Sequence, residues 1–241
     1  SIGMEYLSFG EYEKAKAYFD STSAITEGLR DFSSEANILN CFGSYYVMMK
    51  EYKKAAIYFD SALVQLQNDT DIHKKGIILF HSGVAYYFLN DYKNALVKFD
   101  STLKIMRKTG DKKGESLVLC GLGCLYMTKG DTEKALQYLK ESIEMFEKLR
   151  GSSRTEEIKT GLMADRSFAY EHMVLILLTM GRDEEAFHYA ERNKARVFLD
   201  LLSEREVDIR KGIDGELLEQ ENELQRQMSY YQQCMIKKPS D

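Results

Sequence analysis

Small and aromatic residues recur along this chain at fixed intervals. Each of four glycines is followed three positions later by a tyrosine, and the pair recurs every 40 residues. A spacing of three or four positions places both residues on one face of an α-helix. The glycines are Gly3, Gly43, Gly83 and Gly123, and the tyrosines are Tyr6, Tyr46, Tyr86 and Tyr126. The chain is therefore predicted to be a tandem array of helical units.

A second motif occupies the later half of each unit, where an alanine precedes a large apolar residue by four positions. The alanines are Ala15, Ala55, Ala95 and Ala135, and the large residues are Phe19, Phe59, Phe99 and Leu139. Each unit is thus predicted to hold two helices that pack through small residues and are wedged by the large side chain. Such a unit cannot bury its apolar face alone, so neighbouring units must stack.

The motif G-x-x-Y followed by A-x-x-x-F resembles the tetratricopeptide repeat. The resemblance is strong over residues 1–149 and weaker over 157–203. It implies an all-α fold, a right-handed superhelical solenoid of helix-turn-helix repeats whose concave surface is made mostly by the first helix of each pair. Because surfaces of this kind bind proteins or peptides, the resemblance implies an interaction scaffold and not an enzyme.

The 40-residue period is similar to that of scaffold proteins that regulate heterotrimeric G proteins and spindle orientation. In that group, asparagines two positions before and one position after the glycine grip the backbone of the ligand. The residues at these positions here are Cys41, His81 and Gly121 before the glycine, and Ser44, Val84 and Cys124 after it. The sequence therefore departs from that group at the positions that would grip a ligand.

Four units are predicted within residues 1–149, the first of them truncated at its start. The second helix of the first unit is predicted over about 11–29, and the next three units over about 32–67, 72–108 and 112–149. No proline closes the second helix of any unit, so these helices are expected to be longer than in a 34-residue repeat.

Acidic residues stand at the expected helix starts. Asp31, Asp71 and Asp111 recur at the same phase, just before the first helix of a unit. An aspartate at this place accepts hydrogen bonds from the free amides of the first turn and favours the positive end of the helix dipole. Glu51 and Asp91 are predicted to open the second helices of their units.

The register changes after the fourth unit. Gly130 is matched by Gly181, 51 residues later instead of 40, which indicates an insertion of 11 residues. The insertion is placed in the polar residues 150–156, which are predicted to form a loop, and in the start of the following helix. A fifth, divergent unit is predicted over 157–203. Its predicted apolar face contains Met173, Leu177 and Leu178.

Residues 204–241 are predicted to form a linker and a C-terminal helix over about 214–236. Apolar residues lie there near the a and d positions of a heptad. They are Leu217, Leu224, Met228, Tyr231 and Met235. A helix this short and polar needs a packing partner to be stable.

Residues 189–196, 199–202 and 208–214 resemble the junction that joins a tetratricopeptide array to a caspase-like protease domain of the CHAT family. In that family the catalytic His and Cys lie downstream of the junction. The resemblance implies a second function, in which the chain is the regulatory or sensor segment of a larger cysteine protease and leads into a further domain beyond residue 241.

Composition narrows the possible partners. The 241-residue chain has a net charge of −5, so it lacks the basic character typical of nucleic-acid binding. Its one proline, Pro239, suits a chain made almost entirely of helix. The sequence has neither an apolar stretch of about 18 residues nor a basic and apolar N-terminal signal. We expect a soluble, cytoplasmic protein with neither nucleic-acid nor membrane partners.

Candidate chemical groups are few. Cys41, Cys120, Cys124 and Cys234 lack the spacing of a disulfide framework or a zinc finger, although Cys120 and Cys124 lie one helical turn apart. These cysteines are interpreted as packed thiols, with a metal site as the alternative for the close pair. The sequence has no phosphate loop and no zinc-protease motif. We therefore predict no catalytic residues, no metal and no cofactor.

Two histidines lie beside the candidate binding positions. His81 and His172 are interpreted as interior histidines, with a role as ligand or base as the alternative. No Cys–His pair has a spacing typical of nucleophilic catalysis. A cysteine and a histidine that are distant in sequence can still meet across stacked units.

The first helices of the second, third and fourth units supply the candidate partner-binding residues. Tetratricopeptide geometry places several of their side chains on the concave surface. They are Asn37, Asn40, Ser44, Met48, Ile77, Phe80, Val84, Tyr87, Phe88, Leu117, Cys120, Cys124 and Met127. A strip of aromatic and methionine side chains suits an amphipathic helix or peptide laid in a groove. The alternative is that these side chains pack between neighbouring helices.

Overall fold

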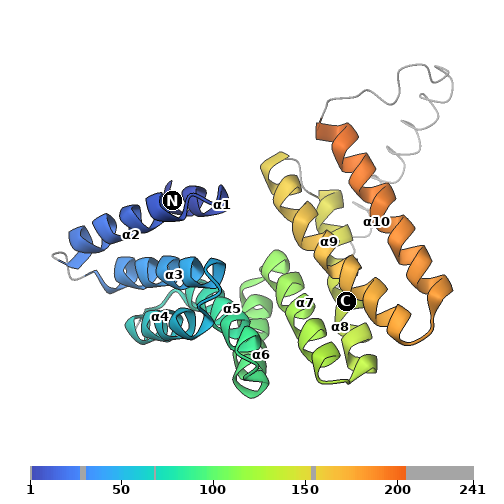
Figure 1. Ribbon diagram of the computed structural model, residues 1–241, viewed down its shortest axis with the longest axis horizontal. Coiled ribbons are helices and arrows are strands. Elements are labelled where there is room, and N and C mark those ends of the chain that lie inside the picture. The colour runs from blue at the N-terminus through green and yellow to red at the C-terminus, as the bar shows by residue number, and fades with distance from the viewer. Residues whose placement is uncertain (1, 28–30, 68, 153–155, 205–241) are drawn as a thin grey trace, which may run out of the picture. The chain divides into compact units, whose positions relative to one another are not determined.

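The computed structural model describes residues 2–27, 31–67, 69–152 and 156–204, which form helices and no strand (Figure 1). The chain divides into two compact units, residues 1–193 and 194–241. Helices α1 to α9 and the first half of α10 belong to the first unit. The second unit is described only over residues 194–204, the end of α10, so the predicted helix over 214–236 lies outside the described residues.

The helices alternate with short connections. Their bounds are α1 Ile2–Ser8, α2 Tyr12–Glu27, α3 Phe32–Met48, α4 Tyr52–Gln65, α5 Ile72–Phe88, α6 Tyr92–Thr109, α7 Lys112–Thr128, α8 Thr132–Ser152, α9 Glu156–Thr179 and α10 Asp183–Glu204. Figure 1 shows them following one another in pairs, such as α3 with α4, α5 with α6 and α7 with α8.

Helices of the first unit stack in the order of the chain. From α1 to α9 each helix packs against the next, and the odd-numbered helices also touch one another in the sequence α1, α3, α5, α7 and α9. The odd-numbered helices therefore form a continuous layer that crosses the repeats. The predicted all-α solenoid fold is confirmed.

The repeated glycines lie where two helices come closest. A Cβ atom added to Gly43 would lie 2.4 Å from the Phe59 ring, and one added to Gly83 would lie 2.8 Å from the Phe99 ring. Both rings are buried, so they cannot move aside without opening the core. The prediction that these glycines are close-packing sites between paired helices is confirmed.

The predicted aspartate caps are also confirmed. The carboxylate of Asp31 accepts hydrogen bonds from the amides of Ser33 and Ser34, and Asp71 and Asp111 accept from the third residue beyond them. Asp91 caps α6 in the same way.

Glu51 precedes α4, as predicted, but its side chain makes no capping hydrogen bond. The longer side chain of glutamate is a poorer fit to the first-turn amides than that of aspartate.

The turn inside each unit has the same left-handed residue. Gly10, Gly130 and Gly181 have φ of 73°, 79° and 69°, and Lys50 and Asn90 have φ of 59° and 60° at the equivalent positions. This residue recurs at the regular period as far as Gly130 and then after a longer interval. The structure therefore contains the register shift inferred from Gly181.

The later helices differ in detail from the expectation. Helix α8 continues to Ser152, so the start of the predicted polar loop over 150–156 is helical. Of the predicted apolar face, Met173 and Leu177 are buried, whereas Leu178 is 51% exposed. One step along a helix turns the side chain by about 100°, which carries Leu178 away from the core side on which Leu177 lies. The limits of the five units otherwise stay a prediction.

Membrane insertion through a helix is not indicated for the described part of the chain. None of its helices combines the length and the apolar character that crossing a bilayer requires.

Candidate functional site

Equivalent positions of α3, α5 and α7 carry different side chains on the layer of odd-numbered helices. Two positions matter most, the one three residues before the repeated glycine and the one directly after it. They are filled by Asn40 and Ser44 in α3, by Phe80 and Val84 in α5, and by Cys120 and Cys124 in α7. The chemical character of the layer therefore changes from one unit to the next.

A groove of about 780 Å³ runs over α1, α3 and α5. Its lining residues are Met4, Leu7 and Ser8 of α1, Ser44, Val47 and Met48 of α3, Phe59 of α4, and Phe80, His81 and Val84 of α5. We call this surface the α1–α3–α5 groove. The structure brings four of the predicted partner-binding residues together here, namely Ser44, Met48, Phe80 and Val84.

The ionisable group in this groove, His81, is held neutral. Nδ1 of His81 lies 2.8 Å from the amide oxygen of Asn40. Because that oxygen can only accept, Nδ1 carries the proton and donates it. Burial lowers the pKa of His81 to about 4. Among the residues that the structure describes, no Asp, Glu, Lys or Arg lines the groove. Its lining is therefore uncharged near neutral pH.

A smaller cavity of about 170 Å³ adjoins the groove, and Phe80 and His81 line both. Ile77 and Leu117, two further predicted residues, line only the smaller cavity. Asn37 is exposed one helical turn before Asn40 and lines neither.

Three other predicted residues lie beyond the groove. The hydroxyl of Tyr87 is 3.0 Å from that of Thr128, which ties α5 to α7. Phe88 is 48% exposed and stacks on Tyr52, with 4.8 Å between ring centroids. Met127 is half-buried and packs against the core cluster shared by α7, α8 and α9. Tyr87 and Met127 thus contribute to packing, whereas Phe88 keeps an accessible face.

The remaining predicted residues, Cys120 and Cys124, are buried at 4% and 6% exposure. They belong to a cluster that includes Leu139 of α8 and Tyr170 and Met173 of α9. A thiol is much smaller than the side chains of Phe80 or Tyr170, so larger neighbours cover it. The α1–α3–α5 groove does not continue as an open surface over these two residues.

Sequence reasoning missed the part of the groove that α1 and α3 contribute through Met4, Leu7, Ser8 and Val47. The repeat period could have identified α1, because Met4 lies 40 residues before Ser44 and Ser8 lies 40 residues before Met48. The concave surface was predicted from the first helices of the second, third and fourth units, so α1 was not included in it.

It also missed an exposed apolar stripe on α9. Phe168, Leu175 and Leu178 are each about half exposed. They lie 51 residues after Leu117, Cys124 and Met127. Applying the 51-residue spacing to the predicted concave positions would have identified these three residues.

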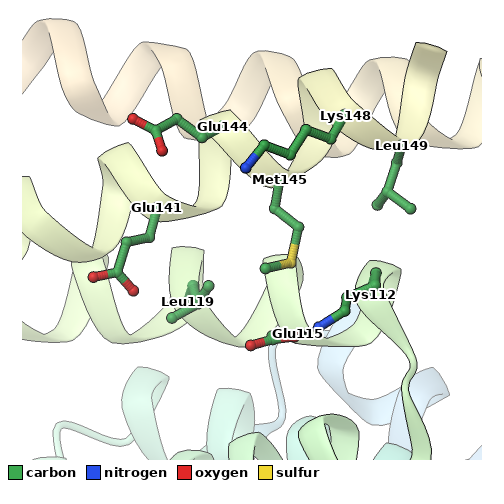
Figure 2. Close-up of a pocket in the computed structure, with 8 residues that line it drawn as sticks. All are labelled: Lys112, Glu115, Leu119, Glu141, Glu144, Met145, Lys148 and Leu149. Atoms are coloured by element: carbon green, nitrogen blue, oxygen red, sulfur yellow. Dashed lines mark hydrogen bonds and ion pairs between the residues drawn. The ribbon is translucent and has the colours of Figure 1, made fainter. Parts of the chain in front are cut away.

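A different kind of cleft, of about 480 Å³, lies between α7 and α8 (Figure 2). Figure 2 shows Met145 of α8 pointing toward α7, near Leu119 and Glu115. Glu115 is buried and accepts from Nε of Arg107 at 2.8 Å and Nζ of Lys112 at 2.9 Å. The two cations hold the pKa of Glu115 below its usual range although burial opposes them. Because its carboxylate already pairs with Arg107 and Lys112, Glu115 is interpreted as part of a structural ion-pair network.

The described residues contain no group of three or more His, Cys, Asp or Glu side chains that could hold a metal ion. Cys41, Cys120 and Cys124 are present as reduced thiols. Cys234 lies outside the described residues.

Family comparisons identify the repeat. Family models described as "Tetratricopeptide repeat" match residues 75–148 and residues 1–21. Among curated proteins no match to the chain is found.

Solved structures of low sequence identity share the fold. BtubC (BKLC) from P. vanneervenii is 16% identical with a TM-score of 0.68, and the match covers 82% of this chain and 78% of that one. A Podosopora anserina putative kinesin light chain with nearly identical TPR-like repeats is 15% identical with a TM-score of 0.60, over 80% and 90% of the two chains.

A third structure was solved with a bound peptide. The Rap conjugation gene regulator of the plasmid pLS20, in complex with the Phr* peptide, is 19% identical with a TM-score of 0.62. The match covers 82% of this chain and 52% of the regulator, so this chain spans about half of its length. At this identity the likeness extends to the fold alone.

Proposed function

We propose that this chain, which contains tetratricopeptide repeats, is a protein-interaction scaffold that binds a partner peptide or amphipathic helix in the α1–α3–α5 groove. The observation that carries the proposal is the groove itself, which combines about 780 Å³ of space with an uncharged lining. An apolar groove between helices accepts the apolar face of a helix through anchors at positions i, i+3 or i+4, and i+7.

The residues in the groove suit such a ligand. Met4 and Met48 have flexible side chains that adapt to the shape of an anchor. Met48 is 49% exposed, so it is accessible before a ligand binds. The neutral His81 adds a polar group without the cost of burying a charge. A peptide ligand is known for a structural relative, since the Rap regulator was solved with the Phr* peptide.

The second function, the regulatory segment of a CHAT-type cysteine protease, rests on the sequence resemblance of residues 189–214. Part of that stretch, residues 205–214, lies outside the described residues. The two functions are compatible, because a sensor segment also binds a partner. Reading the coding sequence beyond residue 241 tests the second one, which requires a downstream domain with a catalytic His and Cys.

The groove is tested with peptides selected on the full chain. A displayed library of random 16-residue peptides is enriched on the wild-type protein, and the affinity of the selected peptides is measured by fluorescence anisotropy. Met48→Glu places a charge in the groove, and we expect it to weaken binding at least about tenfold, because the charge must be desolvated beside an apolar anchor.

Met49→Glu is the matched control. Met49 is the next residue, is 41% exposed and does not line the groove. Binding should survive in this variant, and both variants should melt close to the parent because both positions are exposed. If the selected peptides bind Met48→Glu as tightly as the parent, or if no peptide is enriched, the groove is not the binding site.

A further inference from the structure

His81 has a ring nitrogen that the described residues leave without a hydrogen-bond partner. Its Nδ1 donates to the amide oxygen of Asn40 at 2.8 Å, so in the neutral ring Nε2 carries no proton. Nε2 itself makes no hydrogen bond within the described part of the chain, where the other contacts of the ring are with Phe59 and Phe80. The imidazole therefore has one acceptor to spare.

This acceptor is accessible to a ligand. His81 lines both the α1–α3–α5 groove and the cavity of about 170 Å³ beside it. In the described ranges, the fully enclosed side-chain atom without a partner is the amide oxygen of Asn193. Nε2 of His81 also lacks a partner but is not enclosed in this way, so it borders open space. Its neighbours Phe59 and Phe80, at 5.7 and 5.9 Å between ring centroids, offer it no donor.

The other polar side chains of the lining are also acceptors. The hydroxyl of Ser44 donates to the backbone carbonyl of Asn40 at 3.0 Å, and that of Ser8 donates to the carbonyl of Glu5 at 2.8 Å. A hydroxyl has a single proton, so only the lone pairs of these oxygens remain for a ligand. The described side chains of the groove thus offer acceptors, and each of their donors is already used.

We propose that the α1–α3–α5 groove selects a helix whose apolar face carries one neutral side-chain hydrogen-bond donor, and that Nε2 of His81 accepts from this donor. The inference rests on the proposed function and names the chemistry of its ligand. The donor must be a side chain, because the backbone amides of a helix are already bonded within it. A hydroxyl, a carboxamide or an indole N–H meets this requirement.

Other polar groups fit the same place poorly. A carboxylate would bring a further acceptor against Nε2 of His81. A lysine or arginine side chain could donate, but its charge would be buried against a lining that holds no carboxylate among its described residues. Burial lowers the pKa of His81 to about 4, so the ring remains an acceptor near neutral pH.

A wholly apolar ligand should also bind less well. It would cut Nε2 of His81 off from solvent and put no donor in its place, and a polar group left unpaired in this way costs free energy. A site built around a hydrogen bond to its ligand therefore rejects analogues that lack the matching group. His81 is thus a specificity-determining residue, whereas the apolar side chains of the groove supply general affinity.

The ligand is tested with the peptides selected on the full chain. We expect their apolar faces to contain a neutral donor, which is then replaced by the side chain of nearest shape that lacks it, phenylalanine for tyrosine, valine for threonine or methionine for glutamine. Fluorescence anisotropy gives the affinity of each pair. The analogue without the donor should bind the wild-type protein about tenfold more weakly.

A double-mutant cycle assigns the acceptor to His81. In His81→Asn the side-chain nitrogen can still donate to Asn40, but the shorter side chain has no atom at the place of Nε2. Both members of a peptide pair should then bind this variant about equally. His81→Gln places a side-chain oxygen near that position and should restore part of the preference. His188→Asn changes an exposed histidine of α10 and should keep the full preference.

The outcomes separate this proposal from the groove itself. Selected peptides without a neutral donor, or analogues that bind the wild-type protein as tightly as their parents, overturn the proposal. An equal loss in His81→Asn and the wild type also overturns it, because the acceptor then lies elsewhere. In these cases Met48→Glu still shows whether the peptides occupy the groove. If no peptide is enriched, both the groove and this proposal are wrong. Should His81→Asn fail to fold, the peptide pairs on wild type and His81→Gln decide.

Discussion

His81 and His172 occupy the same position of the repeat, in α5 and in α9, once the register shift is counted. Burial beside Asn40 lowers the pKa of His81, whereas contact with the Cys124 thiol raises that of His172. One backbone position thus supports a neutral imidazole in one region and favours a charged one in the other. The neighbouring unit decides the difference, because it supplies an amide in the first region and thiols in the second.

The two regions also differ in how far their helices are covered. Residues 31–50 and 71–90 have the same degree of burial position by position, whereas α7 is more buried at Glu115, Leu119, Cys120 and Cys124. The backbone of all three helices follows the same pattern. Side-chain size therefore determines whether the layer of odd-numbered helices presents a groove or a covered cluster.

The largest expected effect comes from Phe99, which packs between the regions. Its ring is 2% exposed and contacts the cluster formed by α6 and α7. Phe99→Ala should lower the free energy of unfolding by about 3–5 kcal/mol, because it leaves a cavity. Urea unfolding measures this. A loss below about 1 kcal/mol would mean that the regions do not share this core residue.

The next effect is a difference in pH dependence between the two regions. For His81 the folded pKa lies below the unfolded value of about 6.5, so the unfolded chain binds the proton more tightly. The stability associated with a neutral His81 is complete above pH 6.5 and is lost as the pH falls toward 4. The loss amounts to at most about 3 kcal/mol. Relative to wild type, His81→Gln should therefore become more stable as the pH falls.

His172 should behave differently in the same urea titrations. Its folded pKa is raised, so its contribution is lost as the pH rises through that value. Protonation of Cys124 removes the partner charge as the pH falls through about 6. The cost of His172→Gln should thus be greatest between these two values. Parallel pH profiles for His81→Gln and His172→Gln would remove the contrast between the regions.

A smaller effect compares two glycines. A Cβ on Gly83 would lie 2.8 Å from the Phe99 ring, whereas one on Gly121 would lie 3.2 Å from the same ring. Gly83→Ala should cost about 1–3 kcal/mol through overpacking. Gly121→Ala should cost less, because a shift of a few tenths of an ångström relieves the contact. Thermal melts compare the variants, and equal losses would show that the ring adapts equally on both sides.

Much of the fold could be predicted from the sequence because its determinants are local and periodic. Gly43 and Phe59 recur at fixed spacing, and so do the aspartate caps, so one unit predicts the next. The exposure of Leu178 could not be predicted in this way, because the fifth unit lacks the glycine and tyrosine that recur in the other first helices.

The site was harder to predict because it depends on what a neighbouring unit places over each position. The period locates Cys124 and Val84 equally well, but only the volume of the side chains around them determines that one is covered and the other lines a groove. Cys124 and His172, which influence each other's pKa, lie on opposite sides of the register shift, so no motif contains both residues.

The left-handed turn at Lys50 and Asn90 has a consequence for how such arrays change in length. Each unit reverses direction at the same backbone position, and residues 31–50 and 71–90 are buried alike. We therefore expect that a block of one 40-residue period can be inserted or removed as a unit. Duplicating or deleting one such block changes the number of odd-numbered helices while the remaining units keep the same backbone pattern. The length of peptide that the surface can accommodate is then expected to change in discrete steps, each set by one repeat unit.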